Sequence, residues 1–143
     1  MARSFEKRST PGSLAAVGLI LALVVACSDT AQDVDLSGEW VPDAVPSASI
    51  GPGFDPLKAT IRFSDDGTWT ASDGCNELSG TYTIDGDKFK SPPGGALLGV
   101  GCVHGQVQYA DLLEDAAVVT ESDALVEFYD DSGNMVLRLR RTD

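Results

Sequence analysis

The chain has 143 residues, of which 22 are acidic and 10 are basic, so its formal net charge is −12 at pH 7. This negative charge argues against nucleic acid as a partner, because phosphate backbones would be repelled. The hydrophobic fraction of 43% is enough for a buried core, and the length suits one domain rather than two.

Residues 1–26 have the pattern of an export signal. Arg3, Lys7 and Arg8 make the start basic, and residues 13–26 (SLAAVGLILALVVA) carry no charge. A helix over that apolar stretch would span roughly 21 Å, which is short of the ~30 Å hydrocarbon core of a bilayer. A cleaved signal peptide is therefore favoured over a permanent membrane span.

Cys27 follows the apolar stretch directly. The run Val24-Val25-Ala26-Cys27 resembles the bacterial lipobox, after which signal peptidase II cuts ahead of the cysteine. The resemblance implies that Cys27 is lipidated, so the exported protein would be anchored to the bacterial cell membrane on its extracytoplasmic side. Two or three acyl chains hold firmly, because each buried CH₂ contributes ~0.8 kcal/mol. The alternative is an ordinary secretory signal with a chance cysteine.

Cleavage before Cys27 would leave 117 residues with 7 basic and 21 acidic side chains, a net charge of −14. Residues 27–36 would form the lipid anchor and an acidic spacer, and residues 37–143 a single domain. The charge would keep this domain away from anionic lipid headgroups. We expect a monomer that reaches the membrane through its lipid, and an envelope protein as its partner.

Two cysteines, Cys75 and Cys102, remain for the domain. In an exported domain they form an even set with one pairing. If they join, the chain-entropy model gives ~3.5 kcal/mol of stabilisation for a loop of this length. Cys75 stands in the turn-like stretch Asp73–Gly80 (DGCNELSG), where a thiol could also serve as a nucleophile or a metal ligand.

Strand-like runs dominate the domain. In residues 59–64, Ile61 and Phe63 alternate with polar neighbours, as in a half-buried strand. Other strands are expected at 38–41, 68–71, 81–84, 88–90, 118–121, 124–129 and 135–140, with turns at 65–67, 85–87 and 130–134. The prolines of residues 42–57 predict irregular structure there.

One helix is expected over residues 103–117, where apolar residues recur at spacings of three and four. The connection at 91–101 (SPPGGALLGVG) is rich in glycine and proline. The sequence therefore predicts a mostly β (α+β) fold, a small antiparallel barrel-like meander of about seven to eight strands with one packed helix.

The order of motifs resembles the META domain family, which includes HslJ-like heat-shock proteins and many bacterial lipoproteins. The motifs are G-x-W at 38–40, I-x-F-x-x-D-G at 61–67, G-C-N-x-x-x-G-x-Y at 74–82, a second cysteine before a helix, and a final strand ending in Leu-Arg. The resemblance covers about residues 36–142. It marks as structural positions Trp40, Gly67, Gly74, Asn76, Gly80 and Tyr82.

The resemblance implies a barrel-like domain with roles in heat shock or stress response, antibiotic tolerance and envelope maintenance, and with no catalytic residues. It also supports a Cys75–Cys102 disulfide. The chain departs from the family at Leu98–Cys102, where Thr-x-Met often precedes the cysteine. It departs again at Val103–Gln106, where a glutamate usually opens the helix.

Sharper chemical readings have weaker support. Cys102 and His104 could form a nucleophilic dyad, and Cys75 and a carboxylate could join them in a metal site, but no C-x-x-C or H-x-x-x-H is present. The acidic turns at 85–87 and 130–134 lack the twelve-residue calcium pattern and read as hairpins. A pair among the 21 acids could act on glycosides only inside a cleft, which a sequence does not reveal.

We therefore expect an exported, membrane-anchored META domain lipoprotein without cofactor, metal or enzymatic activity, acting in the envelope, in stress or in protein interaction. The alternative is a lipocalin-like carrier of a small apolar ligand. Core packing is expected for Trp40 and Trp69. No sizeable cavity is expected, because large side chains would fill the barrel, namely Ile61, Phe63, Ile84, Phe128, Leu137 and Leu139.

Overall fold

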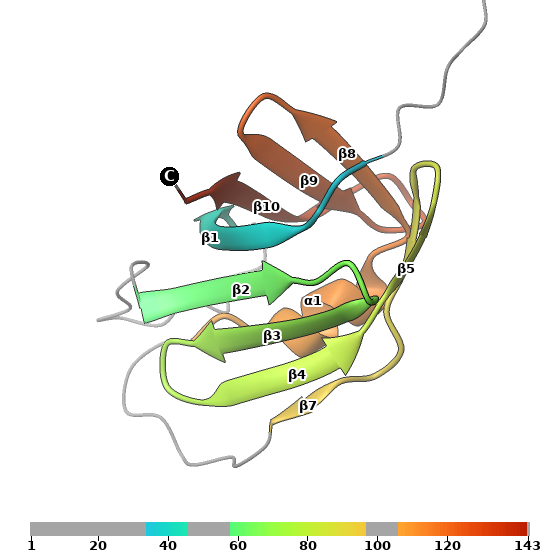
Figure 1. Cartoon of the computed structure of the whole chain (residues 1–143). Coiled ribbons are helices and arrows are strands. Elements are labelled where there is room, and N and C mark those ends of the chain that lie inside the picture. Colours follow the sequence, from blue (N-terminus) through green and yellow to red (C-terminus); the bar gives the residue numbers. More distant parts are fainter. Residues whose placement is uncertain (1–33, 46–57, 97–105, 143) are drawn as a thin grey trace, which may run out of the picture.

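The computed structural model describes residues 34–45, 58–96 and 106–142. Ten strands and one helix lie in these ranges (Figure 1). The strands are β1 Gly38–Ala44, β2 Ala59–Phe63, β3 Thr68–Asp73, β4 Glu77–Thr81, β5 Thr83–Asp85, β6 Lys88–Lys90, β7 Gly95–Ala96, β8 Val118–Ser122, β9 Leu125–Tyr129 and β10 Met135–Arg141. The helix is α1, Tyr109–Asp115. No helix of the described ranges is long and apolar enough to cross a membrane.

The strands form one sheet in the order β5-β6-β8-β9-β10-β1-β2-β3-β4-β7, and all neighbouring strands pair antiparallel. β5 lies at one edge of this order and β4 lies beside the other edge, yet Tyr82 alone separates them along the chain. The backbone through Tyr82 thus joins the two ends of the sheet, which curls into a nearly closed barrel (Figure 1).

The predicted fold class is confirmed. The strands outnumber the predicted seven to eight because the structure contains very short ones, of which β7 has two residues. The predicted turns join β2 to β3, β5 to β6 and β9 to β10. In the first of them, the Ser64 amide donates to the carbonyl of Thr68 at 2.9 Å.

The barrel interior is filled by side chains. Ile61, Phe63, Phe128, Leu137 and Leu139 are 0–1% exposed, and burying each such side chain contributes about 1.5–3 kcal/mol. Ile84 is partly buried against this core. Phe128 stands between two other rings, stacked 6.1 Å from Phe63 and edge-on 5.0 Å from Phe89.

Both tryptophans belong to the core, as predicted, and both are 0% exposed. Their indole N–H groups find acceptors inside the domain. Trp40 Nε1 donates to the carbonyl of Leu36 at 2.8 Å, and Trp69 Nε1 donates to Ser91 Oγ at 3.2 Å. The guanidinium of Arg141 lies 4.2 Å above the Trp40 ring.

Helix α1 crosses the barrel. Its buried residues are Tyr109, Leu112 and Leu113. The helix contacts β4 and β10, which three other strands separate in the sheet. It therefore packs against two walls of the barrel at once.

The helix is shorter than the predicted 103–117. Residues 103–105 lie outside the described ranges, and 106–108 are not helical. The Val107 amide donates instead to the carbonyl of Asp73 at 3.1 Å. At the other end Ala116 is extended, and the Ala117 amide donates to the carbonyl of Tyr129 at 2.8 Å. Pairing with the sheet thus competes with helix formation at both ends.

Three stretches that were predicted as irregular, turn or connection contain strand residues, and one of them is β7 in the connection at 91–101. β1 continues through Pro42 to Ala44, because its pairing with β2 ends at Trp40 and the register with β10 shifts between Pro42 and Ala44. Proline is tolerated at such an irregular position, where its missing N–H is not needed. The second half of DGCNELSG is also strand, since Glu77–Thr81 pairs with β3.

Candidate functional site

The turn between β3 and β4 is built around a buried carboxylate. Asp73 is 3% exposed, and its Oδ1 accepts the amides of Cys75 at 2.8 Å and Asn76 at 2.6 Å. Its own amide donates to the carbonyl of Asn76 at 3.1 Å. Gly74 has a φ of +97°, which favours glycine. The turn chemistry of DGCN thus serves to hold one acid inside the protein.

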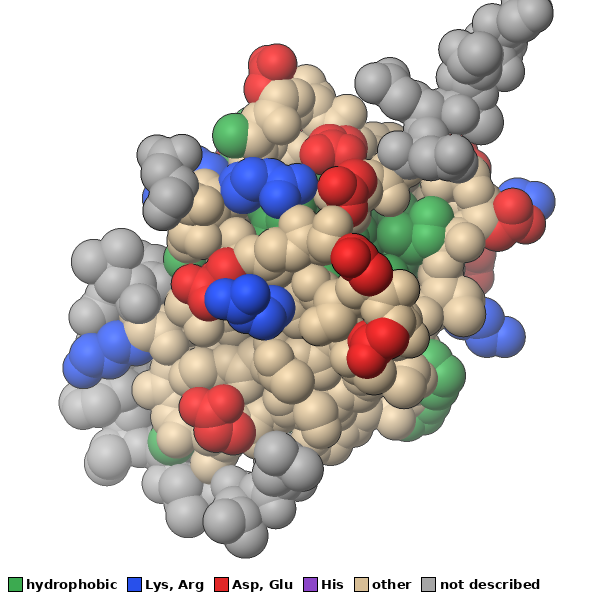
Figure 2. Space-filling model, viewed as in Figure 1, with side chains coloured by type: hydrophobic (Ala, Val, Ile, Leu, Met, Phe, Trp, Pro, Cys, Tyr) green, Lys and Arg blue, Asp and Glu red, His purple; other side chains and the backbone are tan. Residues whose placement is uncertain are grey.

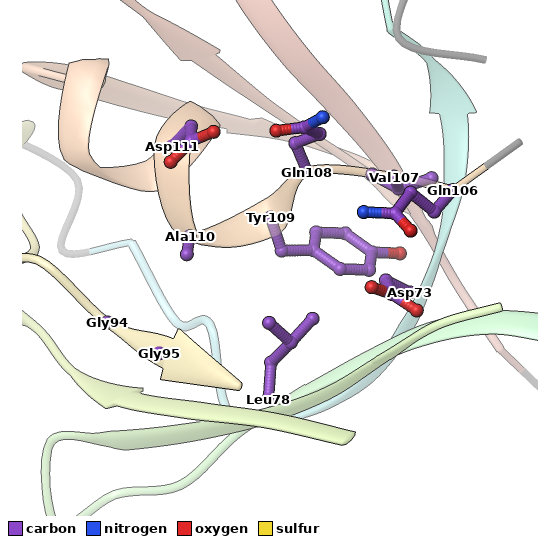
Figure 3. Close-up of a pocket in the computed structure, with 10 residues that line it drawn as sticks. All are labelled: Asp73, Leu78, Gly94, Gly95, Gln106, Val107, Gln108, Tyr109, Ala110 and Asp111. Atoms are coloured by element: carbon purple, nitrogen blue, oxygen red, sulfur yellow. The ribbon is translucent and has the colours of Figure 1, made fainter. Parts of the chain in front are cut away.

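The same turn receives the chain that leads into α1. The hydrogen bond from Val107 to the Asp73 carbonyl places Tyr109 beside the turn. Figure 3 shows the Tyr109 hydroxyl pointing toward Asp73 and Gln106. Tyr109 is 0% exposed, and within the described ranges its hydroxyl has no hydrogen-bond partner.

Burial, and secondarily the negative charge of Asp73, raise the pKa of the Tyr109 hydroxyl above its ordinary value. The phenol is therefore neutral at physiological pH and retains its proton as a donor. An unpaired buried hydroxyl costs about 1–3 kcal/mol, so a partner here would be favourable.

Tyr109, Asp73 and Gln106 line a pocket of about 150 Å³. One wall comes from the strands and the other from the start of α1 (Figure 3). The lining residues are Asp73, Leu78, Gly94, Gly95, Gln106, Val107, Gln108, Tyr109, Ala110 and Asp111. The exposed residues Gly95, Gln108 and Asp111 form its solvent side. The site can therefore admit a small molecule from solution.

Gly80 and Gly94 leave space for the Trp69 ring, because neither has a side chain. A Cβ at Gly80 would lie 2.5 Å from the Trp69 ring, and one at Gly94 would lie 2.6 Å from it. Ser91 Oγ, which accepts the Trp69 N–H, also donates to the carbonyl of Thr81 at 3.0 Å. Residue 80 of the motif is glycine because its backbone lies too close to the Trp69 ring for a side chain.

Gly67 and Tyr82 lie where the barrel closes. The Tyr82 amide donates to the carbonyl of Gly67 at 2.8 Å, and its hydroxyl donates to the carbonyl of Ser64 at 2.9 Å. The Tyr82 ring packs edge-on against Phe63, with centroids 5.2 Å apart. Gly67 has a φ of +79° in its hairpin turn. Gly67 and Tyr82 thus hold the β2–β3 hairpin turn against the chain between β4 and β5.

Several predicted site residues lie outside the described ranges, namely Cys27, Cys102 and His104. The lipid attachment, the Cys75–Cys102 disulfide, the dyad and the metal site of Cys75, Cys102, His104 and a carboxylate therefore stay predictions. Cys75 itself is exposed on the turn. In the described ranges, no group of three or more His, Cys, Asp or Glu side chains could hold a metal ion.

The pocket contains residues that sequence reasoning missed. Tyr109 was expected only as one residue of the predicted helix, and Asp73 only as a turn residue. Their proximity comes from the backbone hydrogen bond at Val107, which no local pattern signals. Gly94 and Ser91 were read as connection residues, and their contact with Trp69 is equally non-local.

The described ranges thus define a small antiparallel barrel crossed by one helix, with a polar pocket where the helix begins. The model of the META domain family matches residues 32–96, so this part of the chain is similar to that family. The match includes the G-x-W, I-x-F-x-x-D-G and G-C-N-x-x-x-G-x-Y motifs. Cys102 and the final strand lie beyond it.

Two solved structures share the fold. A DUF4847 family protein from Bacteroides vulgatus has a TM-score of 0.53 at 13% identity, covering 75% of this chain and 94% of its own. A protein from Burkholderia xenovorans has a TM-score of 0.53 at 20% identity, covering 96% and 99%. At these identities the likeness concerns the fold alone. No curated protein matches the chain significantly.

Proposed function

We propose that the protein is an exported lipoprotein of the bacterial cell envelope, in which Cys27 carries the lipid and the META domain has a non-enzymatic role in stress or protein interaction. The observation that carries the proposal is the position of Cys27. It directly follows a basic start and an uncharged apolar run, and a META family match begins five residues later, at residue 32.

The length of the chain between Cys27 and the barrel sets the reach of the domain. Val34, the first described residue, is seven residues from Cys27, and an extended chain of that length spans at most roughly 25 Å. A lipid on Cys27 would hold the barrel close to the membrane surface. Partners would then be membrane proteins or other molecules within that distance.

The outer surface suits a soluble module near such a membrane. On the face in Figure 2, basic side chains lie among acidic ones. Two ion pairs link neighbouring strands of the sheet, Arg62–Glu39 at 3.1 Å and Arg138–Asp43 at 2.6 Å. Exposed pairs of this kind contribute about 0–1 kcal/mol each, so they affect solubility more than stability.

The alternative of an apolar-ligand carrier has no observation in its favour. Large side chains occupy the described interior of the barrel, and the pocket beside Tyr109 holds about 150 Å³ with charged and amide groups in its wall. A carrier would need a continuous apolar cavity of several hundred Å³.

Metabolic labelling tests the anchor. Radioactive palmitate should label the wild-type chain in bacterial cells, and Cys27→Ala should abolish the label and release the protein from the membrane fraction. Cys75→Ala is the matched control and should remain labelled. Persistent labelling of the Cys27→Ala variant would refute the lipoprotein proposal.

Crosslinking in intact cells tests the interaction role. The membrane-anchored chain should give reproducible crosslinks to envelope proteins, and the released Cys27→Ala variant should lose those that depend on the anchor. An anchored chain with no crosslinked partner, and a deletion strain with unchanged envelope-stress tolerance, would together contradict the role.

A further inference from the structure

One residue that lines the pocket beside α1 has an unused hydrogen-bond donor. Tyr109 is fully buried, its neutral hydroxyl points toward Asp73 and Gln106, which also line the pocket, and the described ranges offer that hydroxyl no partner (Figure 3). Native proteins satisfy nearly all buried polar atoms, so the exception calls for an occupant.

An acceptor lies beside this donor. Asp73 Oδ1 is occupied by two turn amides, whereas Oδ2 has one long contact, 3.5 Å, with Asn76 Nδ2. An ionised carboxylate oxygen can accept more than this. A hydroxyl group is the simplest partner for both, because it accepts from the Tyr109 phenol and donates to Asp73.

Charge and size narrow the ligand further. The negative charges of Asp73 and Asp111 in the lining disfavour anions. The volume of about 150 Å³ matches cavities that hold a molecule of benzene size, with about six non-hydrogen atoms. Leu78 and Val107 give the pocket an apolar part for a carbon skeleton.

We propose that the pocket formed by Asp73, Tyr109 and the start of α1 binds a small neutral polyol of glycerol size. Its hydroxyl bridges the Tyr109 phenol and the Asp73 carboxylate, and its carbons contact Leu78 and Val107. The inference does not depend on the lipid anchor, so it can fail or succeed independently of the proposed function.

NMR titration of the full chain with glycerol tests the site, in a detergent that carries no hydroxyl groups. The amide signals of Gly95, Val107 and Tyr109 should shift and saturate, whereas bulk solvent effects grow linearly and affect the whole surface. Glycerol 3-phosphate should bind more weakly because of its charge. Absent or unsaturable shifts would overturn the proposal, and equal or tighter binding of the phosphate would overturn a neutral ligand.

The variant Tyr109→Phe removes the hydroxyl and keeps the ring. We expect glycerol to bind about tenfold more weakly, which is the effect of one hydrogen bond. The control is Tyr129→Phe, because the Tyr129 hydroxyl is half-exposed and already donates to Glu127 at 2.8 Å. This control should leave glycerol binding unchanged, and equal binding by Tyr109→Phe would overturn the proposal.

Stability without ligand separates a binding role from a structural one. If the hydroxyl is unpaired in the free protein, Tyr109→Phe should keep or raise the urea midpoint. A lower midpoint would mean that the hydroxyl already has a partner, such as a tightly held water, and would exclude the pocket as a polyol site.

Discussion

The backbone of Gly80 passes so close to the ring of Trp69 that a Cβ on residue 80 would lie 2.5 Å from the indole. The two residues face each other across the β3–β4 pair, where Trp69 is the register partner of Gly80. The glycine of the G-C-N-x-x-x-G-x-Y motif is therefore required by the tryptophan on the neighbouring strand.

Gly80→Ala should lower the free energy of unfolding by about 1–3 kcal/mol, because the Trp69 ring must shift in a packed core. Urea denaturation monitored by tryptophan fluorescence measures the effect. Gly95→Ala is the matched control, since a Cβ there has nothing within 4 Å. Equal stability of the two variants would contradict the close approach.

The Cys75–Cys102 disulfide is expected to contribute ~3.5 kcal/mol by constraining the unfolded chain. Mass spectrometry of the oxidised protein should show the linked peptides. Cys75→Ser, Cys102→Ser and the double variant should be destabilised alike, and reductant should bring the wild type to the same level. Two free thiols in protein isolated without reductant would refute the bridge.

Asp66 links the pH to the stability of the first hairpin. Its Oδ1 accepts the hydroxyl of Thr68 at 2.6 Å and the amide of Thr68 at 3.0 Å, and these bonds hold the pKa of Asp66 below its ordinary value of 3.8. A lowered folded-state pKa gives stability that is present above pH 3.8 and is lost as the pH falls through the folded value.

Asp66→Asn should therefore lose stability at neutral pH and depend less steeply on pH between about 4 and 2. Urea midpoints at pH 7 and pH 3 report both effects. Asp65→Asn in the same turn is the control and should follow the wild type. A wild-type slope in Asp66→Asn would show that these bonds do not favour the ionised form.

Arg141 fastens the start of the domain to its end. Its Nη1 donates to the carbonyl of Ser37 at 2.8 Å and its Nη2 to the carbonyl of Asp35 at 3.2 Å, while its guanidinium covers Trp40. Arg141→Ala should speed amide exchange around residues 35–38 and cost about 1–2 kcal/mol of stability. Arg140→Ala, one residue earlier and exposed, should change neither.

Local patterns predicted the parts of the fold that depend on neighbours in sequence. The alternation of Ile61 and Phe63 gave the face of β2, and the turn residues at 65–67, 85–87 and 130–134 gave the hairpins. Two-residue periodicity reports burial directly, so these features follow from the sequence alone.

The remaining features depend on residues far apart in the chain. Pro42 is accepted in β1 because a register shift with β10 lies beside it. The start of α1 is set by the hydrogen bond from the Val107 amide to the Asp73 carbonyl. The barrel closes at Tyr82 because β4 and β5, on either side of this residue, pair near opposite ends of the sheet. The pocket between Asp73 and Tyr109 also depends on contacts between residues far apart in the chain, so no spacing or motif predicted it.

β1 lies between β2 and β10, so the first strand of the barrel needs the last strand of the chain as a pairing partner. One side of β1 has no strand to pair with until Met135–Arg141 has been synthesised. Truncation within the last ten residues should therefore expose an unpaired, aggregation-prone strand edge rather than give a smaller domain. The pairing of Trp40 with Arg141 also brings the two ends of the barrel together. A reporter fused after residue 143 would therefore emerge beside the N-terminal end of the barrel, and a long linker would be needed to carry it clear of the residues before β1.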